Sequence, residues 1–297
     1  MTRRFRRRLN QGRKALLLGL LAASLLSVPS LAQVRTPQAS GTTVFSNGSA
    51  VIDASNASQG YVMVKYSGGT SRIKVRISKR IEYTYDLNTA GNYEVFPLTE
   101  GSGTYTIKVF QQVQGTSYAQ VMSQTVTANI ADSQSPFLYP NQFCNFNANS
   151  AVVAKAAELT GGIADPLAKV QAVYHYAIDH ISYDYQKAAS VQSGYLPVPD
   201  ATLASGKGIC FDYAAVMTSM LRSQDIPTKL VIGYTGGTYH AWVSVYLSGQ
   251  GWVDNIIYFD GTNWRYMDPT FASSGKGDAS VSNYISNQAN YQAKFTY

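Results

Sequence analysis

The stretch Gly206-Lys207-Gly208-Ile209-Cys210-Phe211-Asp212-Tyr213-Ala214 decides how this part of the chain folds. Its two glycines allow a tight turn and a close approach of the backbone to a neighbouring segment. A helical pattern follows at once, because Ala214, Met217 and Leu221 recur four, seven and eleven positions after Cys210. The sequence therefore predicts that Cys210 lies on the first turn of a helix.

A cysteine at the start of a helix is placed as a nucleophile. The first backbone N–H groups of a helix have no partner inside the helix, and the positive end of the helix dipole lies there. Both features favour an anion and so raise the fraction of reactive thiolate. An inert buried cysteine is the competing interpretation, and the turn formed by Gly206 and Gly208 directly before Cys210 speaks against it.

A base and a carboxylate follow the thiol along the chain. His240 occupies a predicted strand, on the face opposite a row of aliphatic side chains: Ala241, Val243, Val245 and Leu247. We therefore expect its imidazole to be exposed to a cleft. Asp268 comes at the end of a later strand, which Pro269 terminates. Cys210, His240 and Asp268 together satisfy the general arrangement of nucleophile, base and orienting carboxylate.

The blocks GICFDYAAVMTSMLRSQDIPTKLVIGY (208–234), HAWVSVY (240–246), Trp264 and MDPTF (267–271) resemble the core of the transglutaminase-like superfamily. The similarity runs from Ile163 to Phe271, with the blocks in the order and spacing of that family. The resemblance implies a papain-like Cys-His-Asp fold of the α+β class, with helices packed on an antiparallel sheet. It also implies thiol-dependent acyl transfer from an amide to an amine or to water.

The resemblance assigns a role to each residue of the triad. Cys210 would attack an amide carbonyl, His240 would pair with the thiolate and protonate the leaving amine, and Asp268 would fix the imidazole tautomer. The backbone N–H of Cys210 is a natural first donor to the oxyanion. Tyr183 is a candidate for the second donor, and the alternative that this tyrosine only packs against its neighbours stays open.

Other ionisable residues near the triad have simpler explanations. Asp260 precedes Gly261 in a predicted turn, and Asp254 is explained by surface exposure. His175 and His180 are five positions apart on one predicted helix, point in different directions and are interpreted as structural. A zinc site that combined one of them with Cys210 and His240 would match no metal motif. We expect neither a metal nor a cofactor.

The first 32 residues have the character of a secretory signal peptide. Seven basic residues precede an apolar stretch from Ala15 to Val28, and Ser30-Leu31-Ala32 supplies small residues before a cleavage point. We expect a secreted or cell-surface protein with no membrane segment after cleavage. The whole chain carries a formal charge of +7, but without this segment 17 basic residues face 17 acidic ones. Nucleic acid is therefore not an expected partner.

The remaining chain divides into an accessory part and a catalytic part. Residues 33–59 are polar and are predicted to be a poorly ordered leader. Residues 60–130 carry β-branched and aromatic runs between turn residues, which predicts a small all-β, sandwich-like domain. Residues 131–147 form a linker, and residues 148–297 form the transglutaminase-like domain. In the predicted strand Ser71–Ser78, the cations Arg72, Lys74 and Arg76 alternate with three aliphatic residues. A solvated face is preferred over a patch that binds an anionic polymer or an acidic substrate.

Within the catalytic part, the pattern predicts two helices before the cysteine. One runs from an N-cap at Ser150 to Leu159, and the next has Asp165 as N-cap and Pro166 at its first position. Residues 186–205 are predicted to be a long loop that forms a wall of the cleft. A strand from Thr228 to Tyr234, a turn at Gly236-Gly237 and a hairpin around Asp260-Gly261 follow the cysteine helix.

The second cysteine, Cys144, has two open interpretations. A disulfide with Cys210 is chemically possible in an exported protein, but it would block the nucleophile. We favour a small buried side chain, because Cys144 lies between Phe143 and Phe146.

The sequence thus predicts an exported cysteine enzyme acting on a protein or peptide amide, with hydrolysis preferred over cross-linking. A cell-surface peptide or a peptidoglycan stem peptide is the expected kind of substrate. The alternative is a non-catalytic, cell-wall-associated binding protein that keeps the fold without the chemistry.

Overall fold

A computed structural model describes residues 34–69, 71–254, 257–259, 264–266 and 287–297 of the chain. The predicted signal peptide, Asp260 and Asp268 lie outside the described residues. The described residues all lie in one compact unit. None of the helices in the described ranges combines the length and the apolar character that a membrane-spanning segment needs.

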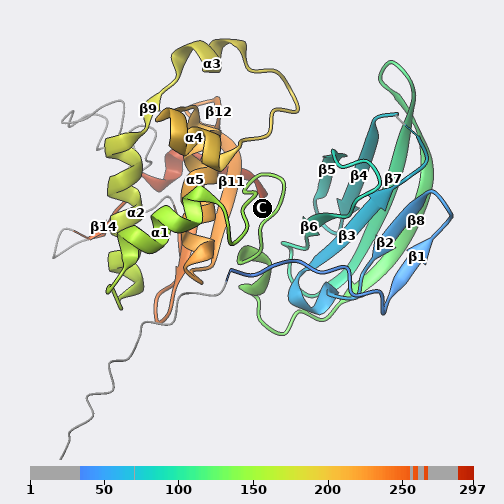
Figure 1. Ribbon diagram of the computed structural model, residues 1–297, viewed down its shortest axis with the longest axis horizontal. Coiled ribbons are helices and arrows are strands. Elements are labelled where there is room, and N and C mark those ends of the chain that lie inside the picture. The colour runs from blue at the N-terminus through green and yellow to red at the C-terminus, as the bar shows by residue number, and fades with distance from the viewer. Residues whose placement is uncertain (1–33, 70, 255–256, 260–263, 267–286) are drawn as a thin grey trace, which may run out of the picture. The chain divides into compact units, whose positions relative to one another are not determined.

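Two antiparallel four-stranded sheets make up the N-terminal part (Figure 1). The first has the order β1-β2-β3-β6, with β1 at Val44–Ser46, β2 at Ala50–Asp53, β3 at Tyr61–Tyr66 and β6 at Glu94–Pro97. The second has the order β5-β4-β7-β8, with β5 at Glu82–Leu87, β4 at Ile73–Ser78, β7 at Gly103–Gln114 and β8 at Ser117–Ala128. Both sheets bury one face, as expected for a sandwich.

Strand β4 shows how the sequence specifies this packing. Ile73, Val75 and Ile77 are buried, whereas the cations between them point outward, because successive side chains of a strand lie on opposite faces. The outward cations are paired: Lys74 lies 2.7 Å from Asp86, and Arg76 lies 3.3 Å from Glu82. This face is an ion-paired, solvated surface and not an unopposed cationic patch.

The prediction of a poorly ordered leader at residues 33–59 is wrong. This segment forms β1, β2 and a short 3-10 helix at Ala57–Gln59. Ala50 and Ile52 are fully buried, and the buried carboxylate of Asp53 accepts hydrogen bonds from the backbone N–H groups of Gly41 and Ser55. The prediction relied on the average polarity of the segment. Such an average does not reveal a strand that contributes only two or three buried side chains to the core.

Among the described residues, the second part of the chain has five α-helices: α1 (Ala151–Thr160), α2 (Pro166–His180), α3 (Tyr185–Ser190), α4 (Pro199–Ser205) and α5 (Cys210–Ser223). The start of α2 is as predicted, since the side chain of Asp165 accepts a hydrogen bond from the backbone of Ala168 at 3.0 Å. Helix α1 begins after Ser150 as predicted, but its first N–H groups, those of Ala151 and Val152, are capped by Asp200 of α4.

The prediction of a continuous loop over residues 186–205 is wrong as well. Helices α3 and α4 occupy most of it, and residues 191–198 connect them. The side chain of Asp184 caps α3 by accepting the backbone N–H of Lys187 at 2.9 Å, and Pro199 begins α4. Prolines and a glycine in this segment suggested a loop, but Pro199 is at the first turn of a helix, where proline is well tolerated.

A four-stranded antiparallel sheet with the order β13-β12-β11-β16 supports the helices. Its strands are β11 (Thr228–Thr235), β12 (Thr238–Leu247), β13 (Gly251–Val253) and β16 (Tyr291–Thr296). The predicted turn at Gly236-Gly237 joins β11 to β12, and both glycines have positive φ, 53° and 80°. Strands β14 (Ile257–Phe259) and β15 (Trp264–Tyr266) pair as a further antiparallel hairpin.

Helix α5 is the centre of this part of the molecule. It packs against β11 and β12 and also contacts α1, α2 and α4. Every residue from Asp212 to Ser223 is buried. The elements that carry the predicted site are therefore fixed by the core: Cys210 by the first turn of α5, and His240 by β12.

Candidate active site

The turn before Cys210 needs both of its glycines. Gly206 ends α4 with a φ of +61°, in the left-handed region that favours glycine. At Gly208, an added Cβ would lie 2.6 Å from the Cβ of Asp212, so the backbone can pass only without a side chain. Cys210 then opens α5, with Ile209 as the residue before the helix, and its side chain is partly exposed. The predicted position of Cys210 on a first helical turn is confirmed.

A short parallel ladder brings Tyr183 to this turn. Strand β9 (Ser182–Tyr183) pairs with β10 (Lys207–Gly208), so that Tyr183 lies opposite Gly208. Burial raises the pKa of the Tyr183 phenol, and the charge of Cys210 raises it further. The tyrosine is therefore a protonated O–H donor within electrostatic reach of the thiol. Its role as the second oxyanion donor stays a prediction.

His240 lies on β12, but the prediction that its ring is exposed is wrong, because its residue is only 6% exposed. Residues 240–245 of β12 are all buried, so both faces of the strand are covered. On the side of His240, Trp242 stacks at 6.3 Å between ring centroids and itself packs against Tyr291 of β16. Alternation along a strand distinguishes two faces but does not reveal whether the second face opens to solvent.

Cys210 and the strand that carries His240 are neighbours. Helix α5 packs on β12, and the residue next to His240, Tyr239, interacts electrostatically with Cys210. Burial raises the pKa of Tyr239, and the charges of Tyr234 and Cys210 raise it further. The structure thus brings Cys210, Tyr183 and the start of β12 together, while Asp268 lies outside the described residues.

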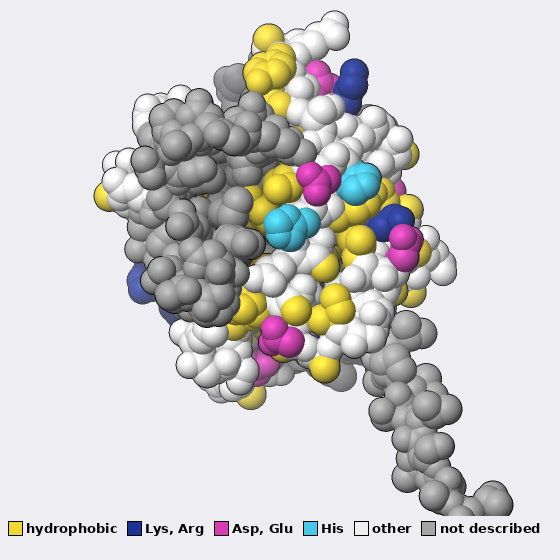
Figure 2. Space-filling model, turned by 90° about the vertical axis from the view of Figure 1, so that its left-hand side faces the viewer, with side chains coloured by type: hydrophobic (Ala, Val, Ile, Leu, Met, Phe, Trp, Pro, Cys, Tyr) yellow, Lys and Arg dark blue, Asp and Glu magenta, His cyan; other side chains and the backbone are white. Residues whose placement is uncertain are grey.

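The other two histidines differ from His240 in their exposure to solvent. His175 and His180 are both exposed on α2, and Figure 2 shows histidine side chains at the surface of one face. His180 stacks on Tyr176 of the same helix at 4.3 Å between centroids, and its Nδ1 lies 3.0 Å from the Tyr176 carbonyl. Within the described ranges, no three His, Cys, Asp or Glu side chains are grouped as metal ligands.

Cys144 is a free, fully buried thiol, so it forms no disulfide with Cys210. Its sulfur accepts a hydrogen bond from Arg222 at 3.2 Å. Burial raises the pKa of Cys144, although the guanidinium of Arg222 acts in the opposite direction. The thiol therefore stays neutral. The interpretation as a buried side chain is right, but the sulfur also has a polar partner.

Sequence reasoning missed Asp212, the third residue of α5. Its carboxylate has no exposed surface and accepts the backbone N–H of Ile209 at 2.8 Å, the ammonium of Lys187 at 2.7 Å and the hydroxyl of Tyr195 at 2.5 Å. We call Lys187, Tyr195 and Asp212 the Asp212 cluster. A signal was present in the opening stretch, because an acidic residue three positions after the residue preceding a helix is a known capping pattern.

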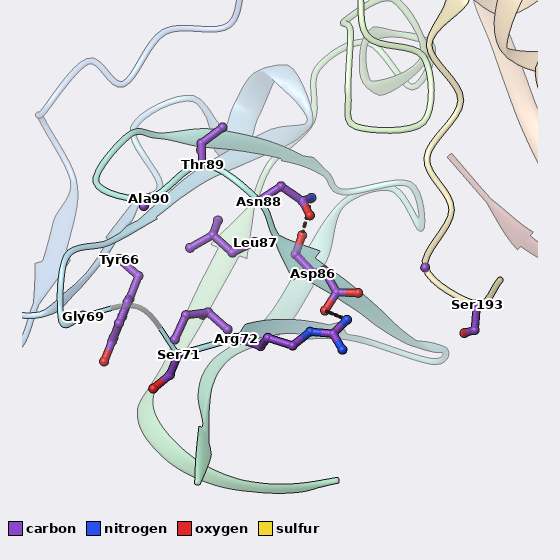
Figure 3. Close-up of a pocket in the computed structure, with 12 residues that line it drawn as sticks. Tyr66, Gly69, Ser71, Arg72, Asp86, Leu87, Asn88, Thr89, Ala90 and Ser193 are labelled. Carbon is purple, nitrogen blue, oxygen red and sulfur yellow. Dashed lines mark hydrogen bonds and ion pairs between the residues drawn. The ribbon is translucent and has the colours of Figure 1, made fainter. Parts of the chain in front are cut away.

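A cavity of ≈ 350 Å³ lies elsewhere, on the sandwich (Figure 3). Its walls are the ends of β3 and β5 with their following turns, together with Ser193 and Gly194 from the connection between α3 and α4. Arg72 and Asp86 face each other in it at 3.8 Å. None of Cys210, His240 and Tyr183 lines this cavity.

Residues 153–269 match the family model described as "Transglutaminase-like superfamily". The chain is similar to that superfamily over this segment, which is less than half of its length. The segment contains Cys210, His240 and Asp268, and it spans α1 to β15.

Two curated relatives are similar to this chain, and one of them has a transglutaminase name. The chain is 25% identical over 237 residues to an uncharacterized protein, YebA, of Bacillus subtilis, covering 73% of this chain and 29% of the relative. It is 30% identical over 120 residues to a protein-glutamine gamma-glutamyltransferase of Pseudomonas aeruginosa, covering 35% and 18%. The chain thus spans less than a third of the length of these curated relatives.

Among solved structures, the periplasmic domain of TgpA from Pseudomonas aeruginosa is 16% identical. The match covers 82% of this chain and 99% of that one, with a TM-score of 0.39. That TM-score is too low to establish a shared fold, so the assignment rests on the family model.

Proposed function

We propose that this chain is an exported, cysteine-dependent acyl-transfer enzyme that acts on a peptide or protein amide, with hydrolysis preferred over cross-linking. The observation that carries the proposal is the position of Cys210. It is the first residue of a buried helix, the residue is partly exposed, and Tyr183 and the strand of His240 lie beside it. The match to the transglutaminase-like superfamily supports the same chemistry.

In the proposed reaction, the Cys210 thiolate attacks the amide carbonyl carbon and forms a tetrahedral oxyanion. The N–H of Cys210 and the O–H of Tyr183 are the proposed donors to that oxyanion. The C–N bond then breaks, the leaving amine takes a proton from His240, and a thioester to Cys210 remains. Water, deprotonated by His240, attacks the thioester, releases the acid and restores the thiol. Asp268 is the proposed partner that holds the imidazole tautomer.

We prefer water over an amine as the acceptor because of how easily water can reach the thioester on Cys210. Water competes well at a thioester unless the site excludes it. The partial exposure of Cys210 supports hydrolysis. The transferase name of the Pseudomonas aeruginosa relative supports an amine acceptor, but the alignment covers only 18% of that protein.

The test compares the wild-type protein with Cys210→Ala. Both are incubated with casein and a labelled primary amine and, in parallel, with purified cell wall. We expect fragments or newly released acid groups from the wild type and none from Cys210→Ala. Label in casein would move the proposal to transamidation, and release of stem peptides from the wall would identify the substrate class. Absence of every product with the folded wild type contradicts the proposal.

The burial of His240 favours the second candidate, a cell-wall-associated binding protein without activity, because a base must reach the reacting groups. Such a protein would sediment with purified wall equally well as wild type and as Cys210→Ala, and neither would release a product. Wall binding accompanied by product release that requires Cys210 would exclude it.

A further inference from the structure

The carboxylate of Asp212 is the most enclosed charged group beside the proposed nucleophile. It belongs to the third residue of α5 and has no exposed surface. One of its oxygens, Oδ2, accepts the backbone N–H of Ile209, which directly precedes Cys210, and also the ammonium of Lys187. The other oxygen, Oδ1, accepts the hydroxyl of Tyr195. A buried carboxylate needs such partners, since an unpaired charge in the interior is strongly unfavourable.

Two of these partners belong to the segment that leads to the cysteine turn. Lys187 lies in α3 and Tyr195 in the connection after it. The ammonium of Lys187 also contacts the Tyr195 hydroxyl at 2.5 Å and lies 4.4 Å from the centre of its ring. Further along, the backbone N–H of Asp184 donates to the carbonyl of Gly208 at 2.9 Å. Hydrogen bonds near both ends of the segment 184–195 therefore hold it against the cysteine turn: Asp184 bonds to Gly208, and Tyr195 bonds to Asp212.

The net charge of the Asp212 cluster is close to zero. Burial lowers the pKa of Lys187, but its hydrogen bonds to Asp212 and Tyr195 outweigh that effect, so the pKa lies above its usual value and the ammonium keeps its proton. Burial and the hydrogen bond to Asp212 raise the pKa of Tyr195, so the hydroxyl also keeps its proton. Asp212 therefore has one cationic partner, and removal of that partner would leave a negative charge inside the first turn of α5.

We propose that Lys187, through Asp212, is a positioning residue for the Cys210 nucleophile: it neutralises the carboxylate beside the thiolate and holds residues 184–195 as a wall of the site. This inference rests on the proposed function of Cys210. The titratable groups around this turn come from several elements. Asp212 of α5 is paired with Lys187 of α3. Tyr183 of β9 and Tyr239 of β12 interact electrostatically with Cys210, and His240 of β12 is the proposed base. Among these, only the pair Lys187–Asp212 couples a cation to the helix start.

The sign of the effect distinguishes this role from a structural one. In Lys187→Met the carboxylate of Asp212 loses its cation, and a thiolate two residues away becomes harder to form. In Asp212→Asn the ammonium remains without its carboxylate, and the thiolate becomes easier to form. At the effective dielectric constant of a protein, a unit charge within one helical turn shifts a titration by about one pH unit or more. The double variant removes both charges and should return close to the wild type.

The experiment measures the rate of iodoacetamide alkylation of Cys210 against pH, with the modified peptide identified by mass spectrometry so that Cys144 does not contribute. We expect the half-maximal rate of Lys187→Met to move up by about one pH unit or more, that of Asp212→Asn to move down, and that of the double variant to coincide with the wild type. Tyr195→Phe, which keeps the ring and both charges, is the matched control and should move much less.

Equal profiles for the wild type and a folded Lys187→Met, or shifts of Lys187→Met and Asp212→Asn in the same direction, overturn the proposal. If one single variant fails to fold, the direction of the other one decides. Alkylation requires no substrate, so the outcome is separate from the proposed function: an active enzyme with unshifted profiles contradicts only this inference. Shifted profiles in a protein that turns over no amide contradict only the proposed function.

Discussion

Gly208 lies so close to α5 that a methyl group there would meet the Cβ of Asp212 at 2.6 Å and Thr202 Cγ2 at 3.1 Å. The same residue pairs with Tyr183 across the β9–β10 ladder. At the scale of single residues, the proposed nucleophile Cys210 is therefore positioned by the absence of a side chain two positions before it. The Asp212 carboxylate, against which Gly208 packs, completes the turn by accepting the N–H of Ile209.

Gly208→Ala should consequently destabilise the protein and slow Cys210. Overpacking of this kind costs about 1–3 kcal/mol, and the displaced turn would move the sulfur. Urea denaturation measures the first effect and the alkylation rate at fixed pH the second. Gly161→Ala is the control, since Gly161 has an ordinary φ of −56° and the added Cβ would approach no atom closer than 3.3 Å. Equal stability of both variants would contradict the close packing at Gly208.

The residue scale also shows what a sequence can and cannot predict. Cys210 and the two glycines were predictable because turn chemistry and helical periodicity are local. The burial of His240 was not predictable, because it depends on strands that are distant in sequence: the neighbouring Trp242 packs against Tyr291 of β16. Asp212 was overlooked although its capping position is local, since its partners Lys187 and Tyr195 lie 25 and 17 residues away.

At the scale of elements, α1 illustrates how a helix can be capped from a distance. Ser150 precedes α1, but its hydroxyl accepts the N–H of Asn147, and the carboxylate of Asp200 in α4 accepts the first two N–H groups of the helix. The sequence pattern places the start of α1 correctly while assigning the cap to the wrong side chain. Strand β16 was not predicted at all, because it pairs with β11 from the far end of the chain.

Asp200→Ala should therefore lower the free energy of unfolding by about 1 kcal/mol, as expected for the loss of a helix cap. Asp200→Asn, which keeps one acceptor oxygen, should lose less. Thermal or urea denaturation checks the difference. An Asp200→Ala variant as stable as the wild type would show that the cap contributes nothing.

At the scale of the whole molecule, one buried cation connects segments that are distant in sequence. The guanidinium of Arg222, 1% exposed, donates to the carbonyls of Thr228 at 2.8 Å, Tyr139 at 2.5 Å and Tyr297 at 2.7 Å. It thus joins α5, the start of β11, the linker and the last residue of the chain. Burial lowers the pKa of Arg222, yet the three carbonyls and Cys144 accept hydrogen bonds from all three of its nitrogen atoms.

Arg222→Met should destabilise the protein by about 3–5 kcal/mol, because buried carbonyls lose their donor. The free energy of urea denaturation measures the loss. Arg72→Met is the control, since that guanidinium is 64% exposed and such surface changes stay within about 0.5 kcal/mol. Similar effects of the two substitutions would contradict the role of Arg222.

Buried tyrosines predict the response of the whole molecule to high pH. Burial raises the pKa of Tyr85 well above 10.0, and the neighbouring Tyr297 and Tyr83 raise it further. A group that keeps its proton longer in the folded state stabilises that state below its unfolded value. The contribution of Tyr85 to stability should therefore be constant up to about pH 10 and fall above it. Tyr85→Phe cannot ionise at this position, so its stability should fall less steeply; an identical slope would count against the assignment.

The central claim is that Cys210 is a nucleophile made reactive by His240. The most direct measurement is the rate at which iodoacetamide alkylates Cys210 at neutral pH, compared between the wild type and His240→Gln. The account predicts that Cys210 of the wild type reacts about tenfold or more faster than in the variant, because only the wild type can share its proton with an imidazole. Equal rates in two folded proteins would contradict it.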